Sequence, residues 1–303
     1  MAPLRPHSRS PIVIKMHSQP PEQNLTKGIS LGILTVALAS CVGAMGKHLT
    51  TMVDISAIVL FQYAICFLFT LPWVLSHGST SLKTQYSWRH GIRGVSGCFC
   101  FYMYYLALKH IPLVDASLLR NTAPLVVPLV LLIGFNNAIP KTRWLPLIVG
   151  FIGIAVILRP GQQGLSLWHL VGFTSGVGLA ISMVYTSLLA QHEPERRILF
   201  YYFLISLIFV VPFFAINYQP IPTEALPWLI AVGIAMYFTF AIYTRAYSYV
   251  TASVLAPTSY FAVVFAGIFD WIFWDHLPDL WSLAGITLVI IGGLLILKLG
   301  KTS

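Results

Sequence analysis

The chain has 303 residues, of which 57% are apolar and only 9% are Asp, Glu, Lys or Arg. An average soluble domain carries about 25% charged residues, so this chain has too few to cover a water-facing surface. The net charge of +9 does not indicate nucleic-acid binding, because the basic residues lie in short groups between apolar runs and not in one patch. The composition predicts an all-α polytopic membrane protein.

The segment 1–27 is rich in Pro, Ser, His and basic residues. It contains no apolar run of the kind that a secretory signal peptide needs. We expect this segment to form a disordered cytoplasmic tail, with Met16 as an alternative start to Met1.

The remainder of the chain is predicted to form ten transmembrane helices. A spanning helix needs about 20 mostly apolar residues. Five such stretches fall in a first unit, residues 28–159, and five in a second unit, residues 167–298. The predicted spans are 28–48, 55–75, 92–110, 113–134, 144–159, 167–190, 198–217, 226–246, 252–273 and 281–298.

The distribution of basic residues predicts the orientation of these spans. Of the 18 Lys and Arg residues, only Lys47, Lys109 and Arg159 are assigned to the outer side, each at the end of a predicted span, while Arg120 falls inside a span. The others, Arg93 among them, are assigned to the opposite side. Since Lys and Arg accumulate on cytoplasmic loops, we expect both termini in the cytoplasm and the protein in the cell (inner) membrane.

The two units are weakly similar when the chain is shifted by 139 residues. Ala107 then meets Ala246, and Gly153 meets Gly292. Each unit holds five spans, an odd number, so the second must cross the membrane in the opposite direction. Inverted repeats of this kind place a binding site near the bilayer midplane between the halves. A helix bundle with accidental similarity is the alternative.

Two segments resemble the EamA family of the drug/metabolite transporter superfamily. The first is Ala107-Leu-Lys-His-Ile-Pro112 with Ala116-Ser-Leu-Leu-Arg-Asn-Thr-Ala-Pro-Leu125. The second is Arg245-Ala-Tyr-Ser-Tyr249 with Ala252-Ser253 and Ala256-Pro-Thr-Ser-Tyr260. The resemblance extends over residues 28–298 and implies ten helices in two inverted repeats. It also implies a central cavity lined mainly by the third, fourth, eighth and ninth helices, with contributions from the first and sixth.

The chain departs from this family in its charged residues. Asn136 and Asn137 stand where the fourth helix of the family usually ends in an acidic residue, whereas Asp275 occupies the equivalent place after the ninth helix. Gln62 stands where many members have Arg in the second helix, and it becomes a candidate cavity residue.

Arg120 is the most informative candidate for substrate binding. It lies seven residues inside its span, and an Arg at that depth costs about 3 kcal/mol or more in lipid. It could bind a carboxylate or phosphate of a solute. It could equally pair with Asp115 or Asp270, or extend to the outer headgroups.

Polar residues and prolines surround Arg120 in the fourth span. Ser117, Asn121, Pro124 and Pro128 recur at helical spacing and share one face. Pro124 removes the backbone hydrogen bond to the carbonyl of Arg120, and Pro257 does the same in the ninth span. Broken helices at matching places in two halves indicate a binding site. Ordinary packing kinks are the alternative.

Tyrosines of the third, eighth and ninth spans are the aromatic candidates. They could stack on a planar solute and donate hydrogen bonds, or they could be core and interface residues. These residues are Tyr102, Tyr105, Tyr237 and Tyr260.

Asp115 and Asp270 are the only carboxylates predicted inside spans. Either could carry a proton in proton-coupled transport. An ion pair or an interfacial position is the alternative.

The sequence favours a secondary transporter of a small organic solute, amino-acid-like and anionic or zwitterionic. A membrane enzyme or lipid-handling protein and a non-transporting partner protein are the alternatives. There is no Walker loop and no metal-ligand spacing, so we expect no enzyme activity, cofactor or metal. The expected partners are the solute and the lipid bilayer, with a homodimer left open.

Overall fold

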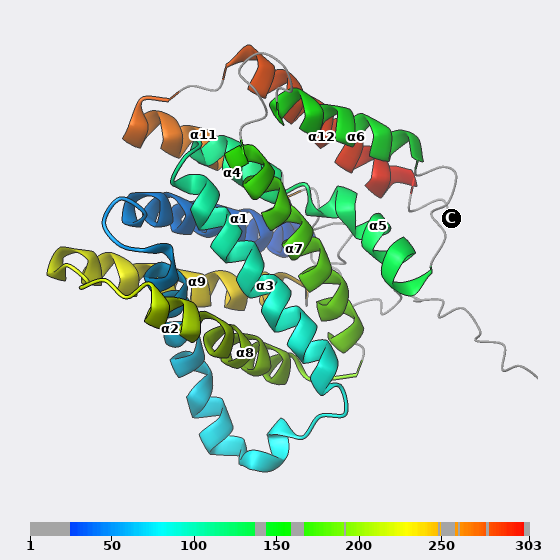
Figure 1. Cartoon of the computed structure of the whole chain (residues 1–303). Coiled ribbons are helices and arrows are strands. Elements are labelled where there is room, and N and C mark those ends of the chain that lie inside the picture. The colour runs from blue at the N-terminus through cyan, green and yellow to red at the C-terminus, as the bar shows by residue number, and fades with distance from the viewer. Residues whose placement is uncertain are drawn as a thin grey trace, which may run out of the picture.

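The computed structural model describes residues 25–136, 144–158, 167–190, 192–247, 249, 258–259, 261–276 and 279–299, and every regular element in these residues is helical (Figure 1). The first half contains α1 (Leu25–Leu49), α2 (Ile55–His77), the 3-10 turn η1 (Ser79–Leu82), α3 (Ser87–Leu108), α4 (Leu113–Arg120), α5 (Ala123–Phe135) and α6 (Trp144–Leu158). The second half contains α7 (Leu167–Ala190), α8 (Glu195–Ile216), η3 (Thr223–Ala225), α9 (Leu226–Tyr247), α11 (Phe261–Trp274) and α12 (Leu280–Leu299).

These helices make ten spans when α4 and α5 are taken as one broken span. Six of them have at least 18 residues and are apolar enough by themselves to cross a membrane, the broken span Leu113–Phe135 included. The helix α3 is long enough but more polar, since it carries Arg89, His90 and Arg93. The predicted all-α membrane fold with ten helices in two repeats is confirmed.

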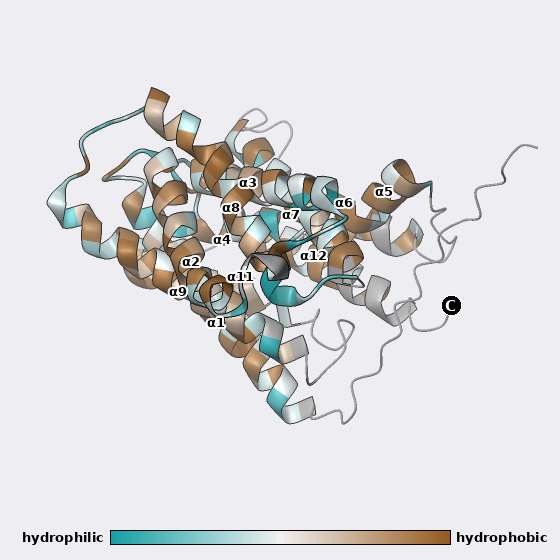
Figure 2. Ribbon diagram, turned by 90° about the horizontal axis from the view of Figure 1, so that it is seen from below, coloured by the Kyte–Doolittle hydropathy of each residue, from teal (hydrophilic) through white to brown (hydrophobic). Residues whose placement is uncertain are grey.

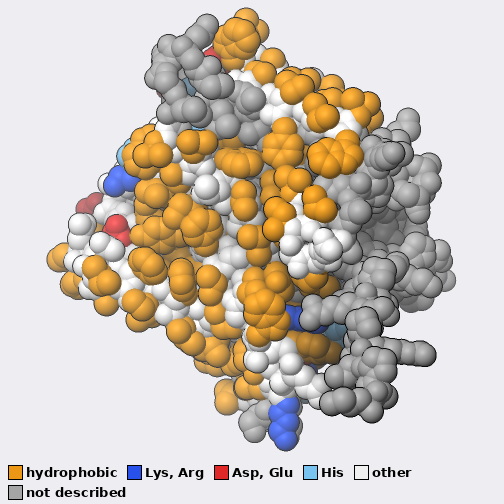
Figure 3. All heavy atoms as spheres, turned by 45° about the vertical axis from the view of Figure 1, so that its right-hand side comes forward, with side chains coloured by type: hydrophobic (Ala, Val, Ile, Leu, Met, Phe, Trp, Pro, Cys, Tyr) orange, Lys and Arg blue, Asp and Glu red, His pale blue; other side chains and the backbone are white. Residues whose placement is uncertain are grey.

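Apolar side chains cover the outside of the bundle. Hydrophobic positions occur around the helices and not on one stripe (Figure 2). On the face in Figure 3, hydrophobic side chains cover most of the described surface and charged ones lie at its edges. Leu75 and Ile133 are more than four-fifths exposed. Such a surface fits the acyl chains of a bilayer, so the protein is a multi-pass membrane protein.

The packing of the helices repeats under exchange of the two halves. The helix α1 packs on α9, and its counterpart α7 packs on α3. Likewise α5 packs on α7 and its counterpart α11 on α1, while α3 packs on α8 and α9 on α2. The equivalent helices α2 and α8 contact each other, as do α6 and α12 (Figure 1). This pattern is that of a pseudo-twofold axis between inverted repeats.

Two glycines related by the shift of 139 make similar contacts in the two halves, although the isoleucines that they face are 140 positions apart. A Cβ on Gly94 would lie 2.5 Å from Ile205, and a Cβ on Gly233 would lie 2.5 Å from Ile65. Glycine therefore admits an isoleucine of the facing helix at both equivalent contacts, α3 with α8 and α9 with α2.

Two sequence-based assignments need correction. The helix α1 begins at Leu25, so residues 25–27 are helical and do not belong to the predicted tail; residues 1–24, with Met1 and Met16, lie outside the described residues. Arg93, assigned to an inner loop, lies inside α3 and is 6% exposed. Its Nε donates to Thr186 Oγ1 at 2.6 Å, and its guanidinium lies over the ring of Tyr202.

Candidate functional site

The fourth span is broken between Arg120 and Ala123. The helix α4 ends at Arg120, and α5 begins at Ala123 with a proline in its first turn. Pro124 has no backbone N–H, so the chain cannot continue the hydrogen-bond ladder of α4 at this point. Two side chains beside the break bond to the last turn of α4: Asn121 Nδ2 donates to the carbonyl of Ser117 and Thr122 Oγ1 to that of Leu119, both at 2.7 Å.

Helix α7 of the second repeat approaches this break very closely. A Cβ on Gly176 would lie 2.5 Å from the carbonyl oxygen of Leu119 and 2.7 Å from Thr122 Oγ1. One turn earlier, a Cβ on Gly172 would lie 3.0 Å from the Leu119 side chain. These glycines of the sixth span allow close helix approach and bring the second repeat against the broken helix.

Arg120 lies on aromatic rings of α3 and is not paired with a described carboxylate. Its Cζ is 4.4 Å from the ring centroid of Phe101 and 5.0 Å from that of Tyr104. A desolvated cation–π contact of this kind contributes about 2 kcal/mol. The Nε of Arg120 is buried without a hydrogen-bond partner. Arg120 therefore retains a donor for a further group.

Two tyrosines continue the polar surface from Arg120. Tyr104 and Ser117 are joined by a hydrogen bond of 3.0 Å between their hydroxyls, and Tyr105 donates to Gln62 Oε1 at 2.5 Å. Gln62 is fully buried, and its Nε2 has no hydrogen-bond partner. The structure thus brings together Arg120, Phe101, Tyr104, Tyr105, Gln62, Ser117 and Asn121, which we call the Arg120 cluster.

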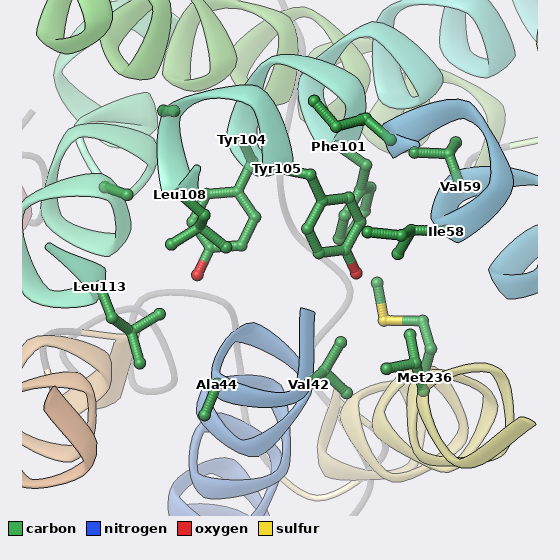
Figure 4. Close-up of a cluster of buried hydrophobic side chains, with 14 of the residues drawn as sticks. Val42, Ala44, Ile58, Val59, Phe101, Tyr104, Tyr105, Leu108, Leu113 and Met236 are labelled. Carbon is green, nitrogen blue, oxygen red and sulfur yellow. The ribbon is translucent and has the colours of Figure 1, made fainter. Parts of the chain in front are cut away.

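Two glycines of α1 make room for these tyrosines. A Cβ on Gly43 would lie 2.6 Å from the Tyr104 hydroxyl, and one on Gly46 would lie 2.2 Å from the Tyr105 ring. Tyr104 and Tyr105 point from α3 toward α1, which carries Val42 and Ala44, and toward Met236 of α9 (Figure 4). The cluster therefore lies where the first and second repeats meet.

Other predicted site residues lie elsewhere. Tyr102 packs on Phe213 of α8, with 5.9 Å between ring centroids, and Tyr237 stacks on Phe69 of α2 at 4.6 Å. Tyr102 thus faces α8 and Tyr237 faces α2, each of which is the second helix of its repeat. Both tyrosines lie outside the Arg120 cluster. Pro128 lies inside α5, whereas Pro257 and Tyr260 lie outside the described residues.

Asp270 forms a buried ion pair that links the repeats. It is fully buried, and its Oδ1 accepts from Lys47 Nζ at 2.7 Å. Its Oδ2 accepts from the backbone N–H of Val114 at 3.0 Å, in the first turn of α4. Lys47, predicted at the outer end of the first span, lies in the last turn of α1 over the ring of Trp274. Asp270 is thus bound by both α1 and α4.

Phe101, Tyr104 and Lys47 are important residues that the sequence does not single out. Phe101 lies three residues before Tyr104 and four before Tyr105, the spacing of one helix face, and this periodicity could have found it. The partner of Lys47 is 223 residues away, so no local pattern reveals that contact. In the described part of the chain, no group of three His, Cys, Asp or Glu side chains could hold a metal ion.

A model of the EamA-like transporter family matches residues 26–159 and again residues 166–298. The chain belongs to the EamA-like transporter family. The two matches are the two repeats of the structure, and they account for its pseudo-twofold packing. The predicted resemblance is confirmed.

Several characterised relatives align with nearly the whole chain. The pseudopaline exporter of Pseudomonas aeruginosa is 27% identical over 270 residues, 88% of this chain and 94% of its own length. The S-adenosylmethionine uptake transporter of Rickettsia bellii is 25% identical, over 91% of this chain and 95% of its own length. A riboflavin transporter of Rhizobium johnstonii is 25% identical over 78% of this chain and 79% of its own length.

A solved crystal structure supports the fold. It superposes with a TM-score of 0.58 and covers 91% of this chain and 98% of its own, at 18% sequence identity. At this identity the match shows the fold alone. The relatives named above are transporters and not enzymes, which agrees with the absence of enzyme motifs in the sequence.

Proposed function

We propose that this EamA-family transporter is a secondary active transporter for a small organic metabolite that carries an anionic or zwitterionic group. An amino-acid-like solute fits best. The solute crosses the cytoplasmic membrane by alternating access between the two repeats, with both termini in the cytoplasm. Inverted repeats and a broken helix at the interface are the features on which this mode of transport rests.

The position of Arg120 carries the proposal. A guanidinium inside a membrane span is retained at a cost, which a functional partner offsets. Here the guanidinium lies on Phe101 and Tyr104 and has an unused buried donor, Nε. A carboxylate of the solute supplies the missing acceptor, since Arg binds carboxylates through paired donors.

The other end of the Arg120 cluster suits an uncharged part of the same solute. Gln62 Nε2 is a second buried donor without a partner, and Tyr105 lies between it and Tyr104. The named relatives carry organic metabolites of different kinds, and S-adenosylmethionine contains an amino-acid group. An amino-acid-like solute agrees with this range and with the charge of Arg120.

The test is solute flux in proteoliposomes containing the purified full chain. A panel of radiolabelled amino acids, nucleosides and organic cations is offered to the native protein, Arg120→Ala, Arg120→Lys and the control Arg196→Ala. Arg196 is an exposed guanidinium in α8, so its removal controls for loss of charge alone. We expect flux of anionic or zwitterionic solutes to fall at least about 100-fold in Arg120→Ala, as when a charge-assisted contact of about 3 kcal/mol is lost.

Two results would count against this proposal. Unchanged affinity for an anionic solute in Arg120→Ala would remove the proposed contact. Absence of flux for the whole panel, with lipid scrambling in the same liposomes, would favour a lipid-handling protein.

A further inference from the structure

The two carboxylates inside the spans have very different surroundings. Asp270 has both oxygens occupied, one by Lys47 and one by the N–H of Val114. A proton on this carboxyl would have to displace a lysine at 2.7 Å and leave that cation unpaired. Asp270 is therefore a structural residue that joins α11 to α1 and α4.

Asp115 is buried but only loosely partnered. Its side chain is 9% exposed, and its Oδ1 has no hydrogen-bond partner. Its Oδ2 lies 3.8 Å from His169 Nε2, which is too long for a hydrogen bond. His169 Nδ1 is also buried without a partner. The pair thus holds two buried polar atoms whose hydrogen-bonding capacity is unused.

We propose that Asp115 and His169 together form the binding site of the coupling proton. With His169 neutral, the pair has a charge of −1. One proton from solution, held on the imidazole or on the carboxyl, makes the pair neutral overall. We assign the proton to the pair because His169 is the nearest polar partner of the Asp115 carboxylate.

The pair lies where a proton can affect the packing of the repeats. Asp115 is the third residue of α4, and His169 is the third residue of α7, so each repeat supplies one member. Drawing the two groups together tightens the α4–α7 contact that continues along Gly172 and Gly176. Arg120 lies five residues after Asp115, about 7.5 Å along the same short helix. Proton binding at the start of α4 therefore affects the position of Arg120 at the end of the same helix.

The other charged groups near this pair are either bonded to each other or exposed. On the helices packed against α4, Lys47 of α1 and Asp270 of α11 neutralise each other, and His169 is supplied by α7. Lys109 and His110 follow α3 and are exposed. His110 stacks on Trp168, next to His169, and partial burial together with the charge of Lys109 lowers the pKa of His110.

The first experiment measures proton binding without any solute. Infrared difference spectra between about pH 5 and pH 8 are recorded for the full chain in lipid nanodiscs, a range in which histidine sites titrate. We expect a protonation signal that disappears in Asp115→Asn and also in His169→Gln, because the two residues titrate together. The control Asp275→Asn makes the same chemical change at an exposed carboxylate and should keep the signal. An unchanged spectrum in Asp115→Asn or in His169→Gln, with folding verified by thermal melting, would overturn the proposal.

The second experiment measures coupling and rests on the proposed transport function. The probe is a radiolabelled mixture of neutral and acidic L-amino acids, tested by counterflow at equal pH and by accumulation under a pH gradient. For one proton per solute, accumulation approaches about tenfold per pH unit. Asp115→Asn should keep counterflow and lose gradient-driven accumulation, whereas retained accumulation would contradict the inference. Absence of counterflow in the native protein would instead count against the proposed function, and the infrared titration would still decide on the proton site.

Discussion

The hydroxyl groups of Tyr63 and Tyr202 lie 2.9 Å apart in the centre of the bundle, and their rings meet nearly at right angles. The two residues are separated by 139 positions, the shift that relates the two repeats. A residue can touch its own equivalent only on the symmetry axis. The contact therefore places the pseudo-twofold axis between α2 and α8, and it shows that the weak sequence repeat corresponds to structural equivalence.

Removal of these hydroxyls should have unequal effects on stability. Tyr63 also donates to the carbonyl of Gly97 at 3.3 Å, so Tyr202→Phe leaves it one partner. In Tyr63→Phe the buried hydroxyl of Tyr202 loses its partner, and the expected cost is about 1–3 kcal/mol. Thermal unfolding of the two single variants and of the double variant measures these losses in stability. Equal losses that add up in the double variant would contradict a direct bond between the hydroxyls.

Gly176→Ala should separate α7 from the break in the fourth span. The new Cβ would lie 2.5 Å from a backbone oxygen, which cannot move without shifting α4. We expect a loss of about 1–3 kcal/mol in stability, together with reduced transport. Gly91→Ala is the matched control, because nothing lies within 4 Å of its Cβ position in α3. Alanine there should be neutral or stabilising by up to about 1 kcal/mol.

The ion pair between Lys47 and Asp270 predicts that removing one partner costs more stability than removing the other. Lys47→Met leaves a fully buried carboxylate without its cation and should cost about 3–5 kcal/mol. Asp270→Asn should cost less, because Lys47 is 14% exposed and its long side chain can reach the interface. The double variant should recover part of the loss of Lys47→Met. Melting temperatures in detergent compare the three, and equal effects of the two single changes would argue against this pairing.

Asn136 and Asp275 give a test of the repeat at the level of the backbone. They are equivalent at the shift of 139, and both have left-handed backbone geometry, with φ of 53° and 51°. Asn and Asp tolerate this geometry better than other residues with side chains. Asn136→Gly and Asp275→Asn should leave the melting temperature nearly unchanged, whereas Asn136→Val should cost about 1–2 kcal/mol. An unchanged melting temperature in Asn136→Val would show that the left-handed geometry at this position does not disfavour valine.

Local patterns in the sequence were sufficient for the spans and for the break beside Arg120. The length of each apolar run predicted a helix, because in a bilayer every backbone N–H and C=O must be bonded within the chain. Pro124 predicted the end of α4 for the same reason, since it cannot donate to the ladder. The tyrosines were harder to assign: Tyr105 joins the Arg120 cluster, but Tyr102, three residues earlier, packs on Phe213. The two positions are only about 60° apart around the helix axis, and no periodicity in an apolar helix indicates which neighbour each position meets.

The amino-acid sequence by itself determined the membrane environment, the ten spans, the repeat and the broken fourth helix, since each follows from hydropathy, length or the chemistry of proline. Only the tertiary structure decided the partners of the charged side chains. Arg120 lies on Phe101 and Tyr104, Lys47 binds Asp270, and His169 stands beside Asp115. The partners of Lys47 and Asp115 come from the other repeat, and the energy of a buried charge depends on contacts within a few ångströms in space, which separation along the chain does not reveal.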